Sequence, residues 1–181
     1  LYATEERYKK LSIYLLEQAY DLQKYDVVLS LRENLSAHLS TQDRNRADYL
    51  KALALIKISQ PGQAESVLAQ LIKTSPKNLM SDYRNALALA IYDQAQAAVR
   101  DKNYLVAINH AIRAASLLPE APTAAEGLYE AIVLSIDNQY WPEAATTIEL
   151  FQKQYPKHQA YQDVGRQLSQ VYINLGNNEK A

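Results

Sequence analysis

A small residue followed by a proline twelve positions later recurs along this chain, and this repeat limits the possible folds more than any other feature. Three such pairs occur, and they are Ala64 with Pro76, Ala107 with Pro119 and Ala144 with Pro156. Further upstream, Val28 occupies the same place, with Ser40 where the proline would be. Internal repetition of this kind predicts a stack of similar units, each burying its apolar face against its neighbours.

The spacing of these residues defines the repeat. We call Val28, Ala64, Ala107, Ala144 and Ala181 the anchor residues, and they are 36, 43, 37 and 37 residues apart. Just before each anchor lies a polar or Gly/Pro/Asn-rich segment, the kind of sequence that ends one helix and begins a turn. These segments are 23–25, 59–62, 101–104, 138–142 and 176–178. Each unit is therefore predicted to be a helix, a tight turn, a second helix and a proline stop.

The composition favours helices throughout. The chain has only 4 glycines and 6 prolines, fewer than a sheet protein of this size needs for its turns. Ala, Leu, Gln, Lys and Glu, all good helix formers, are abundant. We expect an all-α fold of about nine helices, over residues 4–22, 25–39, 43–59, 61–74, 78–101, 104–118, 122–138, 142–155 and 158–175.

This pattern resembles the tetratricopeptide repeat family over nearly the whole chain. The match is best over 140–181, where the family's positions are occupied by Trp141, Ala144, Ile148, Phe151, Pro156, Leu168, Ser169, Tyr172 and Gly176. The resemblance implies a right-handed α-solenoid of antiparallel helix pairs in one domain over 1–181. Its repeats would span about 4–40, 43–77, 78–120, 122–157 and, in part, 158–181.

The chain also departs from the family pattern. Its period of 36 to 43 residues exceeds the usual ~34, and Leu16 and Val28 stand where the family prefers small residues. The first helix of the third repeat is longer by about two turns, which either disturbs the regular geometry or forms a local contact surface. The fifth repeat stops inside its second helix and the only methionine is Met80, so we expect this array to be part of a longer chain.

Motifs for catalysis or for metal binding are missing from the sequence. There is no cysteine, the three histidines (His38, His110 and His158) are far apart, and no HExxH, glycine-rich phosphate loop or GxSxG motif occurs. Gly127 and Gly165 lie near the starts of first helices, where a close helix crossing explains them. We therefore predict no catalytic residue, no metal site, no cofactor and no enzymatic activity.

The charge and hydropathy of the chain bear on its partners and location. A net charge of −1 does not favour nucleic acid, and no stretch approaches the ~18 apolar residues of a membrane span. The ending Phe151…Tyr155-Pro156 is similar to that of tetratricopeptide proteins of the Gram-negative cell envelope. This similarity implies a bacterial protein in the periplasm or attached to the envelope, with the cytoplasm as the alternative.

In the family that this chain resembles, first helices line a concave groove where partners bind. On that mapping Tyr49, Tyr92 and Tyr129 share one first-helix position, with Ile13 and Arg166 as their equivalents in the first and fifth repeats. One helical turn further along lie Glu17, Leu53, Gln96, Val133 and Gln170. Tyrosine offers a large, rigid ring with a polar tip, which suits protein recognition. The alternative is that these rings pack between neighbouring repeats.

We therefore expect a non-catalytic scaffold that binds a protein or peptide segment in this groove. A clamp for the carboxylate tail of a chaperone is excluded, because Ile13 and Glu17 offer such a carboxylate no cation. Two other functions stay open, an accessory domain of a larger enzyme or envelope-biogenesis factor, and a tyrosine-lined face that binds a neutral glycan in an uncharged groove. Self-association through the open C-terminal end is also compatible with the sequence.

Overall fold

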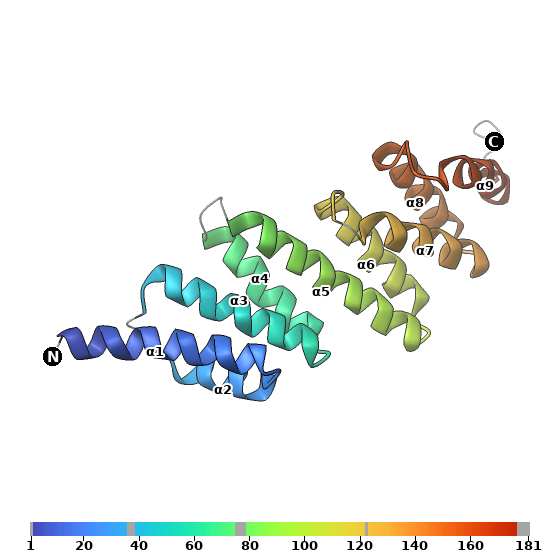
Figure 1. Cartoon of the computed structure of the whole chain (residues 1–181). Coiled ribbons are helices and arrows are strands. Elements are labelled where there is room, and N and C mark those ends of the chain that lie inside the picture. The colour runs from blue at the N-terminus through green and yellow to red at the C-terminus, as the bar shows by residue number, and fades with distance from the viewer. Residues whose placement is uncertain (1, 36–38, 75–78, 122, 177–181) are drawn as a thin grey trace. The chain divides into compact units, whose positions relative to one another are not determined.

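The structure is a computed structural model, and it describes residues 2–35, 39–74, 79–121 and 123–176 (Figure 1). Over these ranges the regular elements are helices, so the fold is all-α as expected. The helices are α1 (Tyr2–Asp21), α2 (Tyr25–Asn34), α3 (Thr41–Lys57), α4 (Pro61–Thr74), α5 (Met80–Arg100), α6 (Tyr104–Leu117), α7 (Ala124–Asp137), α8 (Trp141–Gln154) and α9 (Tyr161–Asn174). The odd-numbered helices are the first helices of their pairs, and the even-numbered ones are the second helices.

Two helix boundaries differ from the expectation by more than a residue or two. The second helix was expected to reach residue 39, but α2 ends at Asn34, and Leu35 has an extended backbone. Ser40 instead caps the next helix, because its Oγ accepts a hydrogen bond from the N–H of Asp43 at 3.1 Å. The last helix was expected from residue 158, but α9 begins at Tyr161, after a turn in which the N–H of Tyr161 donates to the carbonyl of His158.

The chain forms two compact units, residues 1–90 and 91–181, with the boundary inside α5. In the first unit, α1, α2, α3 and α4 pack in sequence around two apolar clusters. One cluster joins Leu16 of α1 to Val28 of α2 and Ala47 of α3. The other joins α3 and α4 to the start of α5, where Tyr83 is buried. The right-handed superhelix stays a prediction.

In the second unit, α6 packs on α7, α7 on α8, and α8 on α9. Phe151 of α8 is fully buried. The hydroxyl of Tyr155 donates to the carbonyl of Pro119 at 3.0 Å, so the segments that follow α6 and α8 are held together. Leu118 and Tyr155, which precede Pro119 and Pro156, leave the helical conformation as residues before proline tend to do.

The same tight turn follows every first helix. It contains one residue in the left-handed backbone region, and these residues are Gln23, Ser59, Lys102, Gln139 and Gly176, with φ of 57°, 60°, 58°, 60° and 73°. Their spacing along the chain is 36, 43, 37 and 37, the same as that of the anchor residues. Glycine is the usual residue in this conformation, because it has no Cβ to clash. Here four of the five turns use a residue with a side chain.

Two backbone hydrogen bonds close the turns after α1, α3, α5 and α7 in the manner of a Schellman motif. After α7, the N–H of Gln139 donates to the carbonyl of Ile136 at 3.1 Å, and the N–H of Tyr140 donates to the carbonyl of Ser135 at 2.8 Å. The equivalent pairs of bonds follow α1, α3 and α5. These bonds satisfy carbonyls that the helix end would leave without partners, and the next helix begins two residues after the left-handed one.

In the four helix pairs that the structure describes, the turn places the anchor residue at the fourth position of the second helix. There the anchor's N–H donates to the carbonyl of the residue before that helix, as in the 2.8 Å bond from Ala144 to Tyr140. Val28, Ala64, Ala107 and Ala144 are all buried. The predicted role of the anchor, a small side chain where two helices approach, fits this placement. Ala181 and Pro76 lie outside the described residues.

The left-handed turns predict how their residues tolerate substitution. Gln139 is exposed, so its replacement acts mainly through the backbone. A β-branched side chain is strained at positive φ, and Gln139→Val should lower the free energy of unfolding by about 1–2 kcal/mol. Gln139→Gly should leave it within about 0.5 kcal/mol, because relief of strain is offset by a more flexible unfolded chain. Urea denaturation followed by circular dichroism measures both.

Gln162→Val is the matched control, since Gln162 is an exposed residue of α9 with ordinary helical geometry. It should cost only about 0.5 kcal/mol through helix propensity. Equal losses for the two valine variants would contradict the turn geometry.

Candidate functional site

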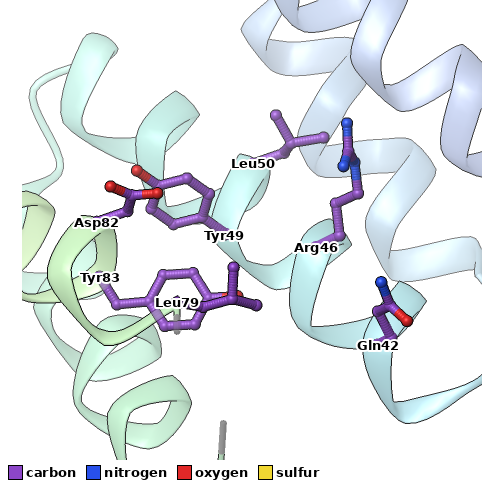
Figure 2. A pocket seen from close by; sticks show the side chains of 7 residues that line it. All are labelled: Gln42, Arg46, Tyr49, Leu50, Leu79, Asp82 and Tyr83. Atoms are coloured by element: carbon purple, nitrogen blue, oxygen red, sulfur yellow. The ribbon is translucent and has the colours of Figure 1, made fainter. Parts of the chain in front are cut away.

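A cleft opens between α3 and the start of α5 in the first unit (Figure 2). Its volume is about 310 Å³, and its lining residues are Gln42, Arg46, Tyr49 and Leu50 of α3, Leu79, which precedes α5, and Asp82 and Tyr83 of α5. The α3 residues recur at intervals of about one helical turn, so they share one face of that helix. In Figure 2, Tyr49 lies beside Asp82 and Tyr83 of α5, and Arg46 and Gln42 lie further along α3.

Two tyrosine rings form the centre of this cleft. The ring centroids of Tyr49 and Tyr83 are 4.9 Å apart, with an angle of 50° between the ring planes. Tyr83 is only 3% exposed and belongs to the apolar cluster of the first unit, whereas Tyr49 is half-buried. Tyr83 therefore holds Tyr49 in place, and Tyr49 presents the accessible surface. Such tilted aromatic pairs are more favourable than their buried area alone suggests.

The second wall of the cleft comes from the additional length of α5. This helix has 21 residues, against 20 in α1, 17 in α3 and 14 in each of α7 and α9. Its first turn supplies Asp82 and Tyr83, so the extension expected from the sequence forms a local contact surface.

Charged groups lie at the edge of the cleft. The guanidinium of Arg46 donates to the Glu17 carboxylate of α1, so that cation is already paired. Asp82 is exposed near Tyr49. Burial raises the pKa of Tyr49, and the negative charge of Asp82 raises it further. The phenol therefore stays neutral and offers a hydroxyl that both donates and accepts.

Tyr92, the second tyrosine of the predicted column, is engaged in packing. A Cβ atom added at Gly127 of α7 would lie 3.0 Å from Cε2 of the Tyr92 ring, so the ring rests on the bare backbone there. The hydroxyl of Tyr92 donates to Oε2 of Glu130 at 3.2 Å, and Nε2 of Gln96 donates to the same oxygen at 2.8 Å. The alternative of packing between first helices therefore applies to Tyr92, and the missing side chain at Gly127 makes room for its ring.

These contacts also affect the titration of Tyr92. Burial raises the pKa of its phenol, and the adjacent Glu130 carboxylate raises it further. A pKa above the unfolded value means that the folded state holds this proton more tightly. The resulting stabilisation is complete below the unfolded pKa, and it is lost as the pH rises through the folded pKa.

A second, more open cleft lies between α7 and α9, with a volume of about 650 Å³. Three groups of residues line it, and they are Glu126, Tyr129 and Glu130 of α7, His158, Gln159 and Ala160 of the turn before α9, and Asp163 of α9. The ring of Tyr129 lies 6.3 Å from that of Phe151, which is part of the buried interior. His158 has a structural role, because its Nδ1 accepts a hydrogen bond from the N–H of Ala160 and its ring packs edge-on against Phe151.

The other predicted groove residues are in different environments. Ile13 is buried in the first unit's core and offers almost no surface, and Leu53 packs against the neighbouring cluster. Val133 and Gln170 are exposed. Arg166 is exposed and pairs with Asp163 at 3.3 Å. Of the predicted positions, Tyr49 and Tyr129 line clefts, and Glu17 supports the first cleft through Arg46.

Several cleft residues were not anticipated from the sequence, namely Gln42, Arg46, Leu50, Leu79, Asp82, Tyr83, Glu126, Glu130 and Asp163. The mapping considered two positions in each first helix, whereas a cleft also uses the adjoining helical turns. The length of α5 was the available signal for Asp82 and Tyr83. Carboxylates line both clefts, so neither cleft is uncharged.

Within the described ranges, no cluster of histidine and carboxylate side chains has the arrangement needed to hold a metal ion. Among the described helices, none has both the length and the apolar character required to cross a bilayer.

The chain was compared with protein families, with curated proteins and with solved structures. No protein-family model matches the chain, and no curated protein does. Among solved structures, the chain is similar to a protein from Podosopora anserina described as a kinesin light chain with nearly identical TPR-like repeats. The identity is 15%, the TM-score is 0.39, and the alignment covers 94% of this chain and 87% of that one. The repeated turns, the buried anchors and the helix packing of this chain by themselves define an array of helix pairs.

The contact between Tyr92 and Gly127 can be tested with a double-mutant cycle. With Tyr92 in place, Gly127→Ala should gain little or destabilise, because the methyl group meets the ring. In the Tyr92→Ala background the same change should stabilise by about 0.5–1 kcal/mol through helix propensity. Urea denaturation of the four proteins should therefore give an interaction energy of about 1 kcal/mol.

Gly165→Ala serves as the control, because only the flexible amide end of Gln152 stands near its added Cβ, at 2.8 Å. Its effect should not depend on Tyr92. If Gly127→Ala stabilised both backgrounds equally, the proposed contact would be wrong.

Proposed function

We propose that this chain is a non-catalytic scaffold that binds a segment of a partner protein along its first helices. The cleft between α3 and α5 is the observation that carries the proposal. It has a volume of about 310 Å³ and an apolar lining from Tyr49, Tyr83, Leu50 and Leu79. One large aromatic or aliphatic side chain fits an opening of this size, and such anchors dominate the energetics of protein interfaces.

The charges at the cleft suggest which residues accompany this anchor. Arg46 is paired with Glu17, so the carboxylate of Asp82 sets the polarity of the opposite edge. A lysine or arginine next to the anchor would place its positive charge near Asp82. The α7–α9 cleft, considered separately, presents Glu126, Glu130 and Asp163 beside Tyr129, and it too favours a basic side chain. Complementary charge of this kind contributes chiefly to specificity and to the rate of association.

The structure does not favour the glycan-binding alternative. A neutral glycan needs exposed aromatic rings to stack on, and among the tyrosines of the predicted column only Tyr49 and Tyr129 line the clefts. Tyr83 is nearly inaccessible and Tyr92 packs on α7, so neither ring offers a platform for a sugar. An accessory role beside a catalytic domain is compatible with a scaffold, because the bound segment then belongs to the same larger protein.

The location in the cell envelope is a separate part of the proposal. It is supported only by the similarity of the Phe151…Tyr155-Pro156 ending to envelope tetratricopeptide proteins.

Selection of peptides against the purified chain tests the cleft directly. Random peptides displayed on phage should be enriched for a large apolar residue next to lysine or arginine. Gln42 is exposed at the edge of the cleft, and Gln42→Trp should fill the cleft from within. The affinity of the variant for the enriched peptides, measured by fluorescence polarisation, should therefore fall at least about tenfold, a loss of ~1.4 kcal/mol in binding free energy.

The matched control is Gln63→Trp, which adds the same ring at an exposed position of α4 outside both clefts. It should leave peptide affinity unchanged. Asp82→Asn should lower the affinity of peptides that contain a basic residue. It should lower the affinity of the same peptides less when that residue is replaced by alanine. Enriched peptides that bind the Gln42→Trp variant as tightly as the original chain would refute the cleft as the binding site.

A further inference from the structure

An exposed apolar stripe runs along α1 and includes Leu22, the first residue after it, on a different face from the one that packs into the first unit. Its side chains are Tyr8 at 67% exposure, Leu11 at 50%, Leu15 at 45% and Leu22 at 68%. The buried face of the same helix carries Ile13, Leu16 and Ala19. Single exposed leucines are ordinary, whereas a row of aligned apolar side chains is typical of surfaces that bind another molecule.

The spacing of the stripe identifies the kind of surface that fits it. Positions 8, 11, 15 and 22 follow the alternation of three and four residues that defines the seam of a coiled coil, with Gln18 at the remaining seam position. A seam of this kind is narrow and straight, so it is complementary to another helix with the same spacing and not to a flat or irregular surface.

The charges beside the stripe are self-complementary when two copies run in opposite directions. Arg7 lies next to Tyr8 at one end, and Asp21 lies next to Leu22 at the other, and both are exposed. Both occupy the same flanking position of the seven-residue repeat, where charges face each other across a helix pair. In an antiparallel pair, Arg7 of each copy faces Asp21 of the other, so the contact forms twice. In a parallel pair this flanking position faces a different position of the repeat, so Arg7 and Asp21 do not meet.

We propose that the α1 stripe is a dimerisation surface, and that its occupant is α1 of a second copy of this chain in antiparallel orientation. Leu11 then packs against Leu15 of the partner subunit, and the same contact recurs across the two-fold axis. The seam spans only two heptads, so the buried area is at the small end for protein interfaces and the dimer forms at micromolar or higher concentration. This surface is separate from the clefts, so the proposal does not depend on the scaffold function.

Sedimentation velocity of the 181-residue chain over a range of concentrations tests the dimer. The original chain should shift from monomer to dimer as its concentration rises. Leu11→Lys and Leu15→Lys should each weaken the dimer at least about tenfold, because every substitution enters the symmetric seam twice. Leu117→Lys, at an exposed leucine of α6, is the control and should leave the dissociation constant unchanged.

A charge exchange tests the antiparallel direction. Arg7→Glu and Asp21→Arg should each weaken the dimer severalfold, and the two substitutions together should restore it, with the attraction reduced by added salt. Circular dichroism of each variant should show the helix content of the original chain. Any of three results would overturn the proposal, namely a monomer at every concentration, a dimer insensitive to Leu11→Lys and Leu15→Lys, or a double charge variant weaker than either single one.

Discussion

The left-handed turn after each first helix is the constraint on which the rest of this structure depends. Its two backbone hydrogen bonds end the first helix, and the second helix begins two residues after the left-handed residue. The turn therefore determines which residue lies at the fourth position of the second helix. That residue is the buried anchor, where a small side chain avoids the overpacking that larger ones cause. Only one of the five turns uses glycine, so the paired hydrogen bonds and the packing of the helix pair maintain a backbone that disfavours side chains.

Because equivalent turns set equivalent registers, Tyr49, Tyr92 and Tyr129 occupy the same position in three first helices. Their surroundings differ, since each ring meets what the following first helix presents. Tyr92 meets the bare backbone of Gly127 and closes the space. Tyr49 meets a buried tyrosine from the longer α5, and a cleft stays open beside it. A repeated scaffold thus produces non-equivalent surfaces through a few residues outside the repeated positions.

This difference explains what could be predicted from the sequence. The anchor spacing and the composition were sufficient for the all-helical fold, the helix order and the places of the turns, because these depend on local signals. Which tyrosine lies beside an open cleft depends on contacts between helices some forty residues apart, such as Tyr92 with Glu130, and no local pattern shows them. The α1 stripe was missed for a similar reason, because apolar spacing on one helix does not tell which face the fold will cover.

The central claim is that one turn geometry, repeated at the anchor spacing, closes the helix pairs. Amide hydrogen exchange followed by NMR tests it most directly at Lys24, Gln60, Asn103 and Tyr140, whose N–H groups donate to carbonyls five residues earlier. The account predicts that all four amides exchange far more slowly than in an unstructured peptide, although they lie in exposed turns. Exchange at peptide-like rates at these positions, while the flanking helices stay protected, would contradict it.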